Sequence, residues 1–304
     1  MAHTHGTGDA DEGGGWRLLV ALALNLVIVV AQVVGGVLSG SLAVLSDAAH
    51  NASDASALGI SYFARRLAKR GPDERRTFGY ARVETVAALV NLTTLVVIGL
   101  YLGGQAVFRL FRPEEVDGTL MLIVGGIAFV EDLLSVVVLW PIMKGSLNVK
   151  SAVLHLAADT ATTVAVIAGA GAVLLGGPSW IDPAITLLLS AVILRHAARE
   201  IREAAAVLMD TAPEGLDIDV LVHAVEAVDG VERLRHVHVW RLDEKRTALE
   251  GHLVVREDSD LDQVEAVRCA VKALLCHRFE IEHATLEVVR PNDAEPSGDV
   301  IADE

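Results

Sequence analysis

The first two-thirds of the chain carry six long apolar runs, whereas the last third changes between apolar and polar positions over much shorter distances. A helix needs about 20 mostly apolar residues to cross a hydrocarbon core roughly 30 Å thick. The six runs reach that length, at residues 16–38, 41–63, 83–108, 119–143, 152–175 and 180–208. The pattern therefore predicts a polytopic α-helical membrane domain with six transmembrane helices.

Basic residues gather in the loops at one end of these predicted helices. The loop between the second and third runs holds the largest group: Arg65, Arg66, Lys69, Arg70, Arg75 and Arg76. The connections 39–41 and 176–179 contain none, and only Arg109 and Arg112 oppose the trend. Basic loops stay in the cytoplasm. We therefore expect a multi-pass protein of a bacterial cell (inner) membrane, in contact with membrane lipids and with both termini in the cytoplasm.

The last third has the periodicities of a small α+β domain. Residues 217–228 and 261–278 repeat with a helical period, whereas 231–242, 248–255 and 281–290 alternate as strands do. This order of helix, strand, strand, helix and strand is typical of an open two-layer sandwich. The complete predicted organisation is a flexible tail at 1–15, a membrane domain at 16–210, a cytoplasmic domain at 211–290 and a disordered tail at 291–304.

Charge and motif content exclude two classes of protein. The formal net charge is −15, and most of it falls in the last third of the chain. Because an acidic surface repels phosphates, nucleic acid is not an expected partner. The chain also lacks the His-Glu-x-x-His arrangement of an intramembrane metalloprotease. We therefore do not expect an enzyme of this class.

Two predicted spans carry ionisable residues at an identical spacing. The second span contains His50 and Asp54, and the fifth contains His155 and Asp159. An ionisable side chain inside a bilayer costs about 2.5–3.5 kcal/mol on insertion scales, so four of them indicate a function. A spacing of four places each pair on one helix face. Two such faces turned toward each other would form a tetrahedral set of four ligands of the kind that zinc takes.

The ligand types narrow the metal without fixing it. Imidazole and carboxylate suit Zn²⁺, Co²⁺, Fe²⁺, Mn²⁺ or Ni²⁺, and the lack of thiolate argues against Cu⁺. Zn²⁺ is the first choice because the four predicted ligands would complete its tetrahedral coordination. Histidine ligands must lose protons to bind a metal, so protons are the natural counter-ion. A membrane metal sensor with the same ligands, or less readily a channel, stays open as an alternative.

Three further acidic residues lie within the predicted spans. Asp47 precedes His50 by one helical turn and is a candidate for the metal path. Glu131 and Asp132 are adjacent on the fourth span, where neighbouring side chains diverge, so both cannot face one site. We assign Asp132 to the proton or metal path, and we expect Glu131 to face another helix or to be protonated.

Five sequence segments together resemble the cation diffusion facilitator family. They are SLAVLSDAAHNASD (41–54), FGYARVE (78–84), HLAAD (155–159), WIDP (180–183) and HVHVW (236–240). The resemblance covers nearly the whole chain in order, and the His-Asp/His-Asp site resembles the zinc transporters of the family. It implies metal/proton antiport by alternating access, a homodimer and a ferredoxin-like cytoplasmic domain. It also suggests a charge interlock between Arg82 and Asp210 at the cytoplasmic end of the membrane domain.

The predicted cytoplasmic strands hold a second group of metal-ligand residue types. Its members are His236, His238, His252, His283 and Glu287. His236 and His238 fall on one face of a strand, and relatives use this domain to sense metal. Arg235 stands where the family usually has histidine, so one expected ligand is missing. A regulatory Zn²⁺ site here is therefore a hypothesis alongside a structural role for His238.

Overall fold

A computed structural model describes residues 15–68, 70–80, 82–139, 147–243 and 246–291 of the chain. Apart from residues 15 and 291, the two predicted tails, at 1–15 and 291–304, lie outside this described part. The chain divides into two compact units. The first comprises Met1–Phe63 with Ala87–Ile201, and the second Ala64–Val86 with Arg202–Glu304.

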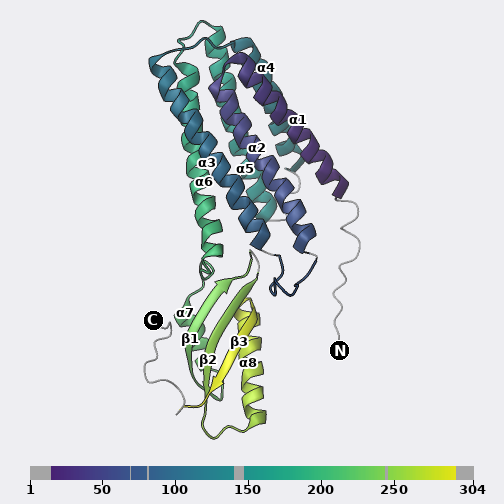
Figure 1. Cartoon of the computed structure of the whole chain (residues 1–304), viewed down its shortest axis with the longest axis vertical. Coiled ribbons are helices and arrows are strands. Elements are labelled where there is room, and N and C mark those ends of the chain that lie inside the picture. The colour runs from purple at the N-terminus through teal and green to yellow at the C-terminus, as the bar shows by residue number, and fades with distance from the viewer. Residues whose placement is uncertain (1–14, 69, 81, 140–146, 244–245, 292–304) are drawn as a thin grey trace. The chain divides into compact units, whose positions relative to one another are not determined.

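Six helices occupy the positions of the six apolar runs (Figure 1). They are α1 (Gly15–Ser39), α2 (Leu42–Ala68), α3 (Arg82–Phe111), α4 (Gly118–Leu139), α5 (Leu147–Leu174) and α6 (Ile181–Leu208). Their ends agree with the prediction within a few residues, although residues 140–143 of the fourth run lie outside the described part. Among the described residues, α3, α6 and Ala157–Leu174 of α5 are long and apolar enough to cross a membrane.

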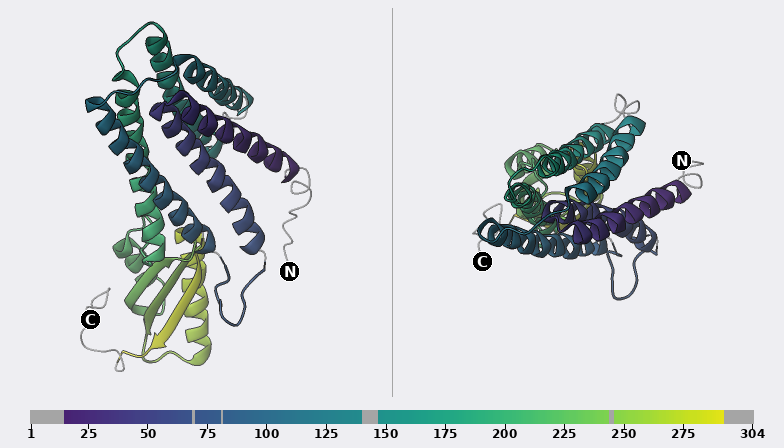
Figure 2. Two further views of the ribbon diagram at one scale, coloured as in Figure 1. Left: turned by 45° about the horizontal axis from the view of Figure 1, so that its top comes forward. Right: turned by 90° about the horizontal axis from the view of Figure 1, so that it is seen from above.

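Small residues let the helices of the first unit approach closely. Helix α4 packs against both α1 and α5 (Figure 2). Gly35 of α1 lies so near Val124 of α4 that a Cβ atom at position 35 would stand 2.3 Å from Val124 Cγ2. Large apolar side chains such as Val27 and Tyr101 are exposed, at 65% and 64%. Exposed apolar side chains of this size are what a lipid-facing helix presents.

The connection between α1 and α2 is held by α3. Gly40 has a φ of +69°, a conformation that glycine adopts without steric cost. Arg109 of α3 donates a hydrogen bond of 2.5 Å from Nη1 to the carbonyl oxygen of Gly40 and forms an ion pair of 2.7 Å with Glu114. Arg109, an exception to the charge asymmetry of the loops, therefore has a structural role at this turn.

Helix α2 is capped by a carboxylate from another helix. Asp182, in the first turn of α6, is only 1% exposed and accepts hydrogen bonds from the backbone N–H groups of Leu42 and Ala43 at 3.0 and 3.2 Å. The hydroxyl of Ser41 donates a third bond to the same side chain at 2.5 Å. The first N–H groups of a helix have no partner within it. Asp182 therefore satisfies these donors at a buried position and links α6 to α2.

The second unit contains the α+β elements in the predicted order. They are α7 (Ile218–Glu226), β1 (Val231–Arg241), β2 (Thr247–Val255), α8 (Leu261–Phe279) and β3 (Ile281–Val289). The strands form one sheet in the order β1-β2-β3, with β1 antiparallel and β3 parallel to β2. Both helices contribute to a buried core that includes Leu221, Val225, Leu249, Leu253 and Leu275. The predicted α+β element order is thus confirmed.

Capping residues mark the helix boundaries in this domain. The side chain of Asp217 accepts from the N–H groups of Asp219 and Val220 at the start of α7. Asp260 and Gln263 form a reciprocal capping box at the start of α8. Such caps stabilise a helix by about 0.5–2 kcal/mol each, which explains why the helical periodicity begins where it does.

Candidate metal centre

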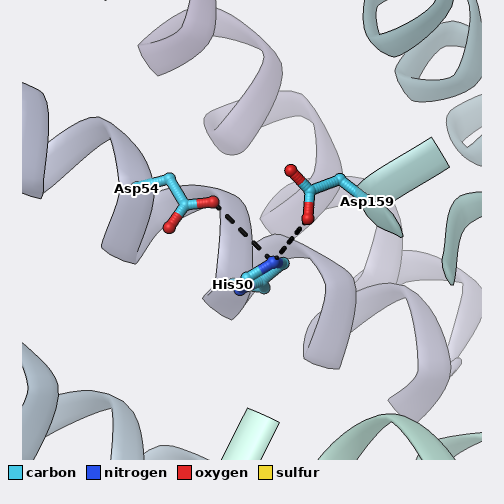
Figure 3. A group of neighbouring side chains, drawn as sticks. All are labelled: His50, Asp54 and Asp159. Carbon is cyan, nitrogen blue, oxygen red and sulfur yellow. Dashed lines mark hydrogen bonds and ion pairs between the residues drawn. The ribbon is translucent and has the colours of Figure 1, made fainter. Parts of the chain in front are cut away.

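Helices α2 and α5 bring three of the four predicted intramembrane ligands together (Figure 3). His50 Nε2 lies 3.0 Å from Asp159 Oδ1 and 3.7 Å from Asp54 Oδ2. One ligand atom from each residue lies within 4.8 Å of those of the other two. The side chains of His50 and Asp159 are 12% and 10% exposed, and that of Asp54 is 34% exposed. The centre is therefore shielded on one side and accessible on the other.

These spacings fit a metal with imidazole and carboxylate ligands. Ligand atoms bound at about 2.1 Å to a tetrahedral ion lie roughly 3.4 Å from one another. The two measured separations, 3.0 and 3.7 Å, fall on either side of that value. Small side-chain rotations would thus bring these ligand atoms to the separations that a divalent cation requires.

The fourth predicted ligand, His155, belongs to α5 and precedes Asp159 by one helical turn. Its side chain lies outside the part that the structure describes. Residues four apart share a helix face, so the backbone places position 155 on the same face as Asp159. Its participation in the centre stays a prediction.

A buried polar network surrounds Asp47. This residue is 3% exposed and accepts a hydrogen bond of 2.7 Å from Gln32 of α1, which is itself 1% exposed. Asn51 donates to Gln32 at 3.0 Å, and Thr162 of α5 reaches Asp47 at 3.4 Å. The network links α1, α2 and α5 directly beside the metal centre. Sequence spacing identified Asp47 but not Gln32 or Thr162.

Asp132 is buried beside the same part of α5. It is 5% exposed and accepts a hydrogen bond of 2.7 Å from the hydroxyl of Thr163. Thr163 in turn donates to the backbone oxygen of Asp159 at 3.2 Å. The adjacent Glu131 is half-buried, so the two neighbours have different surroundings, as their helical divergence requires.

A cavity of about 130 Å³ adjoins the centre. One of the residues that line it is a histidine that was not predicted from the sequence. Asp47, His50 and Asp159 form one part of its lining, and His196 of α6 forms another. The ring centres of His50 and His196 are 6.5 Å apart. The sequence signal for His196 was its place on the sixth span together with Glu200 four residues later, a spacing that resembles the His-x-x-x-Asp pairs of the second and fifth spans.

The cytoplasmic sheet brings four of its five candidate ligands near one another. His236 stacks on His252 with ring centres 4.8 Å apart, and its Nε2 lies 3.3 Å from that of His238. His252 Nε2 lies 3.4 Å from Glu287 Oε2. His236 has a φ of +50° in the bulged part of β1. In the described sheet these groups approach in pairs, and no three of their ligand atoms gather within 4.8 Å.

His283 lies away from this group. It pairs with Ala248 in the sheet, whereas Glu287 pairs with His252. Four positions along a strand correspond to roughly 13 Å. The His283 ring instead meets Phe78 edge-on, with ring centres 5.6 Å apart.

Arg82 and Asp210, the suggested interlock, form an ion pair within the second unit. The guanidinium of Arg82 also donates to the backbone oxygen of Arg241 at the end of β1, at 3.4 Å. The start of α3 is therefore tied both to the segment after α6 and to the sheet.

A helical bundle with an imidazole-carboxylate centre between its helices, followed by a small α+β domain, defines a membrane protein built to handle cations. Residues 18–209 match the family model described as the cation efflux transmembrane domain. Residues 213–288 match the cytoplasmic domain of cation efflux proteins. The chain belongs to the cation efflux, or cation diffusion facilitator, family.

Relatives in three bacteria match almost the full chain. The zinc transporter ZitB of Pectobacterium atrosepticum is 35% identical over 294 residues, covering 95% of this chain and 89% of the relative. The metal cation efflux system protein CzcD of Cupriavidus metallidurans is 34% identical, covering 94% and 89%. The cadmium, cobalt and zinc/H(+)-K(+) antiporter of Bacillus subtilis is 30% identical, covering 95% and 92%. The ZitB and CzcD matches place the chain in that branch of the family.

Proposed function

We propose that this protein exports a divalent transition-metal cation, Zn²⁺ before others, from the cytoplasm in exchange for protons. The observation that carries the proposal is the cluster of His50, Asp54 and Asp159 between α2 and α5. His155 completes a set of four ligands. The metal is the transported substrate, and it occupies this centre only during transport.

Two considerations favour zinc. Two imidazoles and two carboxylates are ligands that bind Zn²⁺ in a tetrahedral arrangement. The filled d shell of Zn²⁺ imposes no other geometry. The relatives named for zinc, and for cadmium, cobalt and zinc, have ions of this class as their substrates. Co²⁺ and Cd²⁺ are therefore the competing substrates to test against Zn²⁺.

Proton exchange follows from the chemistry of the ligands. Zn²⁺ binds only deprotonated imidazole and carboxylate, so each binding event releases protons and each protonation event weakens binding. The centre faces the two sides of the membrane in turn, releasing protons when it takes up metal and taking up protons when it releases metal. Asp47 and Asp132, both buried next to the centre, provide the proton path.

The assembly we propose is a homodimer in the bacterial inner membrane, with six spans in each chain. Both termini lie in the cytoplasm, on the side of the domain formed by residues 213–288. The concentration of basic residues in the loop between α2 and α3 supports this orientation. The Arg82–Asp210 ion pair then stands at the cytoplasmic end of each membrane domain.

Zinc flux into sealed proteoliposomes tests the function. With protein inserted so that its cytoplasmic side faces outward, we expect Zn²⁺ uptake into vesicles with an acidic lumen. A dye enclosed in the lumen reports the uptake. A protonophore should slow this uptake to the rate of protein-free vesicles, because the proton gradient supplies the driving force. Zinc binding without gradient-dependent flux would refute transport and favour the membrane sensor.

We also propose a regulatory Zn²⁺ site on the cytoplasmic sheet, formed by His236, His238, His252 and Glu287. Rotation of these side chains would direct three imidazoles and one carboxylate to a single ion. We expect His252→Ala to remove one bound Zn²⁺ per full-length chain in equilibrium dialysis, because His252 contacts both His236 and Glu287. His223→Ala, on α7 of the same domain, is the control and should leave the stoichiometry unchanged. An unaltered zinc content in the His252 variant would contradict the site.

A further inference from the structure

The cavity beside the metal centre has one apolar wall, and that wall ends in a histidine. Leu189, Val192 and Ile193 of α6 line the cavity together with His196. They precede His196 by seven, four and three residues, so all four lie on one helix face. Among the described α6 residues that line this cavity, His196 alone carries a metal-ligand atom.

His196 stands where α6 approaches the cytoplasm. The helix continues from this point into the segment that precedes the cytoplasmic domain, which begins at residue 213. The residue is exposed, whereas His50 and Asp159 are largely shielded. An ion that passes from the cytoplasm through this cavity therefore meets His196 before it reaches the buried centre.

The geometry distinguishes His196 from a member of the resting centre. Two imidazoles on one tetrahedral ion have ring centres roughly 5 Å apart, given metal–nitrogen bonds of about 2.0–2.1 Å. The observed separation from His50 is 6.5 Å, with the rings at 84° to each other. A modest side-chain rotation would close that gap. His196 is thus within reach of an ion that His50 also binds, but outside the tighter group that His50 forms with Asp54 and Asp159.

The neighbouring charges make an imidazole the suitable group at this place. The charged neighbours of His196 along the helix are Arg195, Arg199 and Glu200, and none of them lines the cavity. A guanidinium, moreover, has no acceptor atom for a metal. A neutral imidazole offers a lone pair and is a common metal ligand. A purely structural role, such as edge-on packing against His50, would not require a nitrogen atom at this position.

We propose that His196 is an additional metal ligand, which receives the divalent cation from the cytoplasm and passes it to His50. The ion first bridges His196 and His50 at the mouth of the cavity. It then exchanges His196 for Asp54 and Asp159 as it enters the centre. No bond other than metal coordination is formed or broken. This inference rests on the proposed transport function and assigns a step to its cytoplasmic side.

The test combines flux with metal binding in the full-length protein. For His196→Ala we expect the KM for Zn²⁺ to rise about tenfold, in the range seen when a group next to a metal is removed. The maximal rate should change by less than about twofold, because the buried centre is intact. His196→Cys should restore most of the KM, since a thiolate is also a zinc ligand. His277→Ala, on α8 of the cytoplasmic domain, is the control for loss of an exposed imidazole.

Co²⁺ absorption provides a readout that does not depend on transport. In the Asp159→Ala background, the weakened visible band of bound Co²⁺ should diminish further when His196→Ala is added. An unchanged band together with an unchanged KM would overturn the role of His196. If wild-type protein showed no gradient-driven flux, or if Asp159→Ala transported normally, the proposed function itself would fail, which is a distinguishable result.

Discussion

Replacement of Asp159 by asparagine should abolish zinc transport while leaving the protein folded. Asparagine has nearly the same shape but lacks the negative charge that helps to neutralise a divalent ion. Asp159 Oδ1 of α5 also lies 3.0 Å from His50 Nε2. Because loss of a group that merely supports a ligand costs about 10–100-fold in metal affinity, loss of a ligand should reduce flux at least about 100-fold.

The measurement is gradient-driven Zn²⁺ uptake in proteoliposomes, with size-exclusion chromatography to show that the variant stays intact. Asp117→Asn is the matched control, since it makes the same chemical change at an exposed residue that caps α4. We expect that control to transport at the wild-type rate. Normal flux in Asp159→Asn would show that metal does not pass through the centre between α2 and α5.

The second large effect concerns stability, and it is expected from Asp182→Asn. Asp182 accepts from two backbone N–H groups and one hydroxyl, all buried at the start of α2. An asparagine side chain offers a single acceptor oxygen and directs an NH₂ group at the remaining donors. Leaving buried donors unsatisfied costs about 1–3 kcal/mol each, so we expect a loss of roughly 2–5 kcal/mol.

Thermal unfolding in detergent, followed by the loss of the monodisperse peak on size-exclusion chromatography, measures this effect. Asp117→Asn again serves as the control. It caps α4 through the N–H groups of Thr119 and Leu120, but at an exposed position where asparagine is an equally good cap. A melting temperature of Asp182→Asn within experimental error of the control would mean that α2 does not depend on this carboxylate.

The arrangement of elements was predictable because it depends on local patterns. Each apolar run became a helix, and the change from helical to strand periodicity located α7, β1, β2, α8 and β3. The predicted helix ends were less accurate where charged residues extend a helix beyond its apolar part. Helix α2, for example, continues through Arg65 and Arg66 to Ala68, because a helix can carry charged residues outside the hydrocarbon core.

The candidate site was predictable to the extent that its residues are spaced along one helix. His50 and Asp54 are four apart, so the sequence alone put them on one face. Gln32 and His196 were not selected, and Asp182 was named only within the WIDP segment, because the contacts of each involve a residue of a different helix. Only the packing of the bundle brings Gln32 to Asp47, or His196 to the cavity. The pairwise approach of the cytoplasmic histidines likewise depends on the bulge in β1.

The turn at Gly40 has a consequence for how the protein is inserted during synthesis. Helix α2 contains Asp47, His50 and Asp54, which oppose partition into lipid by about 2.5–3.5 kcal/mol for each charged group. Only two residues separate it from α1, and Gln32 of α1 already binds Asp47. We therefore expect the translocon to release α1 and α2 together as a helical hairpin. Asp47, beside the future metal centre, would thus have Gln32 as a hydrogen-bond partner before α5 has left the ribosome.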